Sequence, residues 1–143
     1  ADMGMRYVVI TSVDRDDLYA QAGLGPADMD LLELYDDYPV INAMQLEDLG
    51  FCAKGEAPQF IRKNTFTTTG TMPLNTSGGQ LSVGQAGAAG GYLGLVEAVR
   101  QLTGQPLGEA VPNARHALVS GFGMINYDRG LCSGALVLSR GDA

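Results

Sequence analysis

Residues 75–91 read NTSGGQLSVGQAGAAGG, and this is the most informative stretch of the chain for its fold. These glycines precede a segment with helical spacing of apolar residues, so they stand where a helix begins. Such a loop gathers backbone N–H groups and the positive end of the helix dipole, a point where a phosphate or an oxyanion can bind. The alternative is that the small residues only permit close packing against another backbone. No Gly-Lys-Ser/Thr follows, and no clean strand precedes, so neither a P-loop nor a dinucleotide fingerprint is indicated.

Length and composition exclude several classes of protein. The chain has 143 residues and is 45% apolar, as expected of one globular domain. Its net charge of −7 argues against nucleic acid or an anionic membrane as a partner. We see neither a signal peptide nor an apolar run of the ~18 residues that a membrane helix needs. The two cysteines, Cys52 and Cys132, form no CxxC pattern, which favours a reduced, cytoplasmic setting.

The order of expected elements is typical of an α/β layer structure, with helices layered on a mixed sheet. Strands are expected at residues 6–12, 30–34, 117–122 and 134–138, and helices at residues 14–22, 39–49 and 87–102. The last two strands, joined by residues 124–132, predict a C-terminal β-hairpin at one edge of the sheet. Residues 52–74 are expected to be loop, in which residues 65–71 could form an irregular strand.

The glycine-rich stretch resembles a motif of the thiolase superfamily, N-x-x-G-G, four residues and then G-H-P-x-G-A-x-G. The matching positions, in ungapped register, are Asn75, Gly78, Gly79, Gly84, Ala89 and Gly91. Agreement with the lipid-transfer (sterol-carrier-type) branch continues at residues 22–24 (AGL), 28–30 (DMD), 33–38 (ELYDDY), 49–52 (LGFC) and 101–104 (QLTG). The resemblance spans about residues 18–140. It implies that residues 1–143 are a single thiolase-like C-terminal domain, without the N-terminal half that carries the nucleophilic cysteine.

The chain departs from the motif where the family has its histidine, because Gln85 stands there, and Ala86 replaces the proline. In the family that histidine acts as a base or stabilises the thioester oxyanion. A glutamine can donate a hydrogen bond but cannot accept and return a proton near neutral pH. The resemblance therefore implies an oxyanion role for Gln85. It also makes Asn75, Gly78, Gly79 and Gly84 candidate substrate-binding residues.

Proton transfer must then be sought at other side chains. Tyr127 falls near the position of the family's second cysteine, and thiolase-like aldolases of the steroid-degrading branch use tyrosines. Its alternative role is that of a loop aromatic residue packed on the hairpin. Cys132 lies off that register, and we interpret it as a small hydrophobic residue of the last strand.

Residues 33–38 correspond to a family segment that lies beside the active site. Tyr35 replaces the Asn or His that orients a water there, and Asp36 matches the family's acid. A solvated strand end is the alternative for this acidic run. Cys52 is not expected to be a nucleophile, and a metal site is not expected around the lone His116.

Three functions follow from the resemblance. The first is a C-terminal domain or subunit of an acyltransferase-family protein that makes or breaks carbon–carbon bonds in acyl-CoA thioesters, with the thioester as substrate and no cofactor. The second is a retro-aldolase on CoA thioesters with tyrosine acid/base chemistry. The third is a non-catalytic half that completes a partner subunit. The resemblance also implies a homo- or hetero-oligomer with an N-terminal thiolase half or, in some branches, a zinc-ribbon/OB-fold subunit. Activity of the domain alone is not expected.

Overall fold

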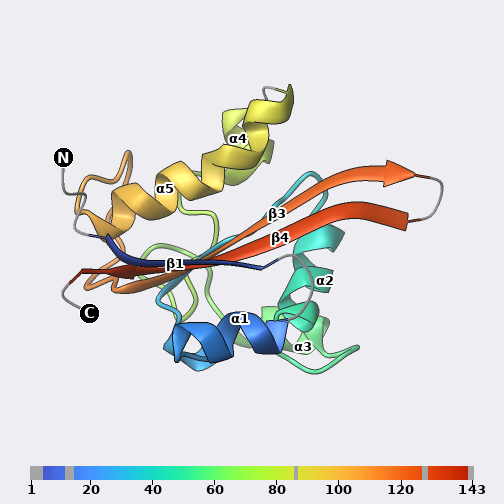
Figure 1. Cartoon of the computed structure of the whole chain (residues 1–143), viewed down its shortest axis with the longest axis horizontal. Helices are drawn as coiled ribbons and strands as arrows, with labels where there is room; N and C mark the ends of the chain where they lie inside the picture. The colour runs from blue at the N-terminus through green and yellow to red at the C-terminus, as the bar shows by residue number, and fades with distance from the viewer. Residues whose placement is uncertain (1–4, 12–14, 86, 127–128, 142–143) are drawn as a thin grey trace.

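The computed structural model describes residues 5–11, 15–85, 87–126 and 129–141. At its centre is a four-stranded sheet with the order β1-β4-β3-β2 (Figure 1). The strands are β1 Met5–Thr11, β2 Leu31–Glu33, β3 His116–Asn126 and β4 Arg129–Arg140. β2 runs parallel to β3, whereas β4 is antiparallel to both β3 and β1. The predicted α/β fold with a mixed sheet and a C-terminal hairpin is confirmed.

Helices cover both faces of this sheet (Figure 1). One face carries α1 Arg15–Ala22, α2 Pro39–Asp48 and α3 Ala57–Lys63, with the 3-10 turn η1 Pro26–Asp28. The other carries α4 Gly79–Val83, the 3-10 helix η2 Gly87–Tyr92 and α5 Leu93–Leu102. In the described part of the chain the longest helices, α2 and α5, have ten residues each, and none could cross a membrane.

Successive side chains of the strands β2 and β3 pack alternately into two hydrophobic cores, one on each face of the sheet. Leu118 of β3 packs with residues of α1 and α2, whereas its neighbours Ala117 and Val119 pack beneath α5. This period of two is the geometry of a strand that is buried on both faces. Burial of each leucine contributes about 1.5–3 kcal/mol. The same alternation places Leu31 of β2 in the α5 core and Leu32 in the opposite core, so Glu33 is directed toward α5.

Three expectations about the elements were wrong. The hairpin occupies the centre of the sheet, because β1 and β2 pair with its outer sides. Residues 57–63, expected to be loop, form α3. Residues 65–71 contain bends and turns, in line with the loop expected over residues 52–74 and without the irregular strand that was its alternative. Residues 87–92 form η2, so the α-helix begins only at Leu93. The glycines of this segment weaken a regular α-helix, and Gly87 has a φ of +54°.

Candidate active site around Tyr35

A pocket opens where β2 ends, between the sheet and the α4–α5 layer. Its walls come from β2 and the residues after it, the loop before α4, the start of α5, and β3. The lining residues are Glu33, Leu34, Tyr35, Asp36, Asn75, Gly79, Gln80, Gly90, Gly91, Leu93, Gly94 and Ser120.

Asn75 fixes the loop to the end of β2. Its Oδ1 accepts from the backbone N–H of Leu34 at 2.7 Å, and its Nδ2 donates to the carbonyl of Leu34 at 3.0 Å. The backbone N–H of Asn75 adds a third bond, to the carbonyl of Leu32 at 2.8 Å. Asn75 has a φ of +49°, a conformation that asparagine tolerates better than most residues. The amide thus continues the pairing of β2 where the strand itself stops.

Asp36 is buried and caps the first turn of α4. Its Oδ1 accepts from the backbone N–H of Gln80 at 2.7 Å, and its Oδ2 accepts from that of Leu81 at 3.4 Å. A Cβ on Gly79 would overlap the Asp36 carboxylate, and Gly79 has a φ of +65°. The sequence suggested that backbone N–H groups at this helix start could bind an anion. In the structure two of them, those of Gln80 and Leu81, already donate to the side chain of Asp36.

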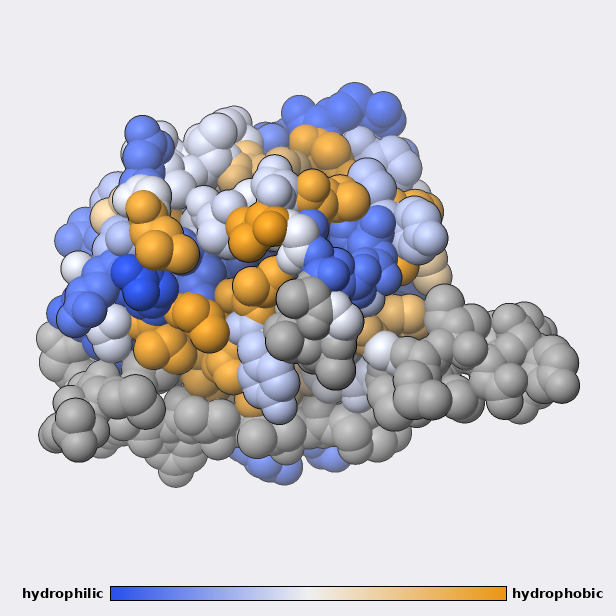
Figure 2. Space-filling view, turned by 90° about the horizontal axis from the view of Figure 1, so that it is seen from above, coloured by the Kyte–Doolittle hydropathy of each residue, from blue (hydrophilic) through white to orange (hydrophobic). Residues whose placement is uncertain are grey.

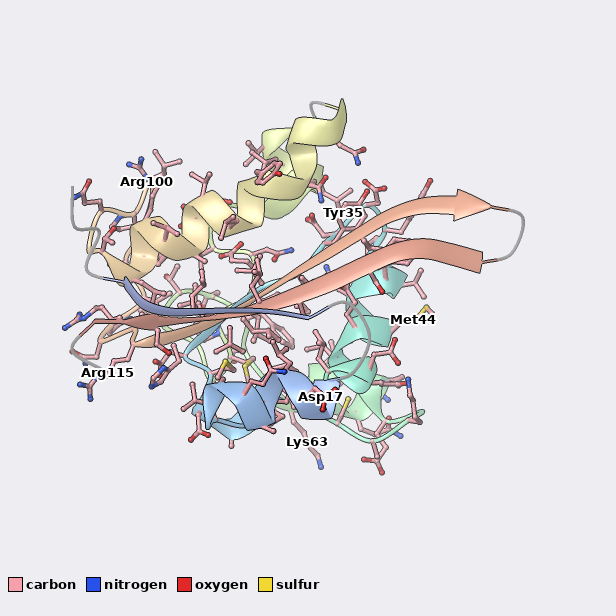
Figure 3. All side chains as sticks on the ribbon, viewed as in Figure 1. Asp17, Tyr35, Met44, Lys63, Arg100 and Arg115 are labelled. Atoms are coloured by element: carbon pink, nitrogen blue, oxygen red, sulfur yellow. The ribbon has the colours of Figure 1, made fainter. Side chains whose placement is uncertain are left out.

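Both backbone polar groups of Tyr35 are hydrogen-bonded to side chains. Its backbone N–H donates to Ser120 Oγ at 3.1 Å, and its carbonyl accepts from Gln45 Nε2 at 2.7 Å. Its ring packs on Phe122 of β3, with centroids 6.1 Å apart and an angle of 52° between the planes. Figure 3 shows Tyr35 between β3 and the α4 end of the upper helical layer.

The phenol of Tyr35 is the middle of a hydrogen-bonded chain. Its Oη donates to Asp37 Oδ2 at 2.6 Å and accepts from Gln85 Nε2 at 2.9 Å. An ionised carboxylate only accepts, so the phenolic proton points to Asp37. Desolvation, and then the hydrogen bond and charge of Asp37, raise the pKa of Tyr35, while the Gln85 hydrogen bond lowers it. The phenol is neutral at physiological pH, with its free lone pair available to another donor.

A second polar cluster lies deeper, between β2 and α5. The backbone N–H of Thr76 lies 3.1 Å from Glu33 Oε1, and its hydroxyl lies 2.9 Å from the same oxygen and 2.9 Å from Glu97 Oε1. Burial raises the pKa of Glu33 to about 8; the two Thr76 hydrogen bonds oppose this, and the charges of Glu97 and Asp36 add to it. The raised pKa favours the protonated form of Glu33.

The comparison with known proteins assigns the family. The model of the family described as thiolase C-terminal domain-like matches residues 12–133. This chain belongs to that family. The membership inferred from the glycine-rich stretch is thereby confirmed.

Relatives of this thiolase C-terminal domain include two steroid enzymes. It is 45% identical over 103 residues to the 17-hydroxy-3-oxo-4-pregnene-20-carboxyl-CoA lyase of Mycobacterium tuberculosis, covering 72% of this chain and 26% of that protein. It is 47% identical over 87 residues to the steroid side-chain-cleaving aldolase of Thermomonospora curvata, covering 61% of this chain and 22% of that protein. A solved structure of an Ltp2-ChsH2(DUF35) aldolase matches with a TM-score of 0.74 and 34% identity, covering 89% of this chain and 31% of that one. The chain thus spans about a quarter of the length of the relatives it matches.

Most of the residues singled out in the sequence come together in this thiolase domain. Tyr35, Asp36, Asn75 and Gly79 line the pocket, and Gln85 bonds to Tyr35. Gly78 precedes the first residue of α4 and Gly84 follows its last, both with positive φ. Tyr127 lies outside the described residues.

Two acidic residues of the site were not predicted. The sequence indicates Asp37 only as part of an acidic run and Glu33 only as a member of a buried strand. The signal for Asp37 was its spacing of two from Tyr35, which directs both side chains to one side of an extended segment. The signal for Glu33 was an acid inside an apolar run, since a buried acid needs partners.

Neither a thiol nor a metal site was found at this pocket among the described residues. Cys52 packs in the core on the α1–α3 face of the sheet, away from Tyr35. Burial, and then the charges of Glu47 and Glu56, raise the pKa of its thiol, which disfavours the reactive thiolate. The described part of the chain also holds no group of three His, Cys, Asp or Glu side chains that could bind a metal ion.

Proposed function

We propose that this domain supplies the proton-transfer site of an enzyme that cleaves a carbon–carbon bond in an acyl-CoA thioester by retro-aldol chemistry. The observation that carries the proposal is the chain from Gln85 through Tyr35 to Asp37. The names of two relatives, a CoA lyase and a side-chain-cleaving aldolase, support this class of reaction.

The hydrogen bond that Tyr35 donates to Asp37 supports a role for Tyr35 as a proton relay. A β-hydroxyl group of the substrate donates its proton to Tyr35 Oη while the phenolic proton passes to Asp37 Oδ2. The carbon–carbon bond then breaks, its electron pair moves into the thioester enolate, and a ketone or aldehyde leaves. The proton returns by the same route to the enolate carbon, so the acyl-CoA product forms with no net change in the protein. Gln85 Nε2 steadies Oη throughout.

Retro-aldol cleavage suits this site better than thiolytic acyl transfer. Acyl transfer of the thiolase type needs a cysteine thiolate and a base that activates it. Gln85 cannot serve as that base. The proposal includes the thioester as substrate without a separate cofactor, in a cytoplasmic setting that the free thiol of Cys52 supports. The oxyanion role of Gln85 and proton transfer at Tyr127 stay predictions.

A second protein half is part of the proposal. The α4–α5 layer exposes several large apolar side chains, and Figure 2 looks onto this face, where apolar residues lie between polar ones. They are Leu81, Val83, Tyr92 and Val96. We infer that an N-terminal thiolase half, in the same polypeptide or in a partner subunit, covers them and completes the thioester site. The name of the solved Ltp2-ChsH2(DUF35) aldolase contains two components, which supports a partner subunit. A zinc-ribbon/OB-fold partner stays a prediction.

The test uses the full-length protein with its natural partner and a branched β-hydroxyacyl-CoA, with the acyl-CoA and carbonyl products measured by mass spectrometry. Tyr35→Phe removes the hydroxyl and is expected to lower turnover about 10²–10⁴-fold. Tyr38→Phe is the matched control, since Tyr38 is 65% exposed, and it is expected to leave turnover unchanged. Wild-type turnover in both Tyr35→Phe and Tyr127→Phe would refute tyrosine catalysis and favour a non-catalytic half.

A further inference from the structure

Thr76 stands between two buried carboxyl groups. Its Oγ1 lies 2.9 Å from Glu33 Oε1 and 2.9 Å from Glu97 Oε1, and both glutamates are 2% exposed. A threonine hydroxyl has a single proton, and an ionised carboxylate has none. If both glutamates were ionised, Thr76 could donate to only one of them. Its Oγ1 would then lie 2.9 Å from the oxygen of the other glutamate with no proton between the two atoms.

We propose that Glu33 and Glu97 share one extra proton through Thr76, and that this proton fixes the glycine-rich loop and α5 onto the end of β2. In the simplest arrangement Glu33 donates to Thr76 Oγ1, and Thr76 donates to Glu97 Oε1. Gln101 Nε2 completes the set by donating to Glu97 Oε1 at 2.8 Å. The proposal concerns positioning and does not depend on the reaction proposed above.

The surroundings favour a single negative charge on the pair. The strongest charges acting on Glu33 come from Glu97 of α5 and Asp36 after β2, both acidic, and burial raises the pKa of Glu33 to about 8. On the β3 side the partner of Glu33 in the strand register is Val119, an apolar residue. Arg100, one turn further along α5, points away from the sheet (Figure 3). The second oxygen of Glu97 is also buried without a hydrogen-bond partner among the described residues.

The shared proton sits where three segments of the site meet. Thr76 follows Asn75, which holds Leu34, the residue before Tyr35. Gln101 extends the network past α5, because its Oε1 accepts from the N–H of Val111 at 2.9 Å and its Nε2 donates to the carbonyl of Glu109. Loss of the proton would set two buried carboxylates against each other and loosen the contact between α5 and β2.

Hydrogen exchange of the full-length protein, followed by mass spectrometry, tests the proposal. Protection of residues 74–83 and 93–104, corrected for intrinsic exchange rates, is expected to fall about tenfold per pH unit between about pH 5 and 8 and then to level off. Glu33→Gln is expected to abolish this slope. Thr76→Ser is expected to keep both protection and slope, whereas Thr76→Val is expected to lower protection at every pH, because it removes the hydroxyl that links the two acids. Glu109→Gln, which alters an exposed carboxylate beside this network, is the control that keeps the slope.

Infrared spectroscopy of the wild-type protein provides a second readout that no variant's misfolding can obscure. A C=O stretch of a buried protonated carboxyl group is expected at neutral pH and is lost above about pH 8. The absence of that band at neutral pH would overturn the proposal. A Glu33→Gln protein that keeps the wild-type exchange slope would overturn it equally.

Discussion

Tyr35 donates its phenolic proton to Asp37 across 2.6 Å, although only one residue separates them in the chain. The bond leaves the phenol as an acceptor toward Gln85 and toward any substrate. Asp37 and Gln85 act on Tyr35 in opposite directions, since the carboxylate stabilises the phenol and the amide stabilises the phenolate.

Asp37→Asn is expected to lower the pKa of Tyr35, because the variant removes both the accepting carboxylate and its charge. Gln85→Ala is expected to raise the same pKa. Both are measured by ultraviolet titration of tyrosinate, with Tyr35 isolated by subtracting the titration of a Tyr35→Phe protein in the same background. If the midpoint stayed in place in both variants, the hydrogen-bonded chain would not exist in solution.

Gly79→Ala is expected to destabilise the domain more than Gly104→Ala. Both glycines have a positive φ, of +65° and +71°, so each substitution incurs a backbone strain of about 1–3 kcal/mol. Only at Gly79 would the new methyl group also displace Asp36 from the first turn of α4. The free energies of unfolding, from denaturant titrations, should therefore differ. Equal losses in the two variants would argue that Asp36 does not cap α4.

Asn75→Asp is expected to lower the free energy of unfolding by about 1–3 kcal/mol at neutral pH, because the Nδ2 that donates to the carbonyl of Leu34 is replaced by a second acceptor. The charge also comes close to Asp36. The loss should diminish below about pH 4, where a protonated carboxyl group regains a donor. Asn113→Asp is the control, since Asn113 is exposed and also has a positive φ, of +57°. A loss that did not depend on pH would contradict this account.

Cys52 is expected to react with iodoacetamide more slowly at neutral pH than the same cysteine in an unfolded peptide. Burial, Glu47 and Glu56 raise its pKa and so reduce the thiolate fraction. Glu56→Gln is expected to increase the rate modestly, because it removes one of the two charges. Peptide-resolved mass spectrometry measures the alkylation. A rate at or above that of the peptide would reopen the question of Cys52 as a nucleophile.

Local signals in the sequence were sufficient where they act within one element. The helix predicted at residues 39–49 is α2, since proline suits its first turn and Gly50, with a φ of +83°, follows its end. The apolar runs of β2 and β3 were found because strands buried on both faces need no alternation. The strand order could not be read in this way, because it depends on pairing between distant segments.

The features that sequence reasoning missed are short or non-local. α3 and α4 have seven and five residues, too few to show a helical period. α4 also depends on a cap supplied by Asp36, which lies 44 positions before Gln80. Glu33 was placed correctly on a strand, yet its partners Thr76 and Glu97 belong to two other segments. Such contacts become visible only in the folded chain.

The strand order means that the sheet cannot be completed before β4 has been synthesised. β4 lies between β1 and β3, so the first strand of this segment has no partner until the last one has been made. While a ribosome builds residues 12–128, β1 is an unpaired edge that can pair with the wrong chain. A stop codon before Arg129 would remove β4, one of the two central strands, and leave β1 detached from β3 and β2.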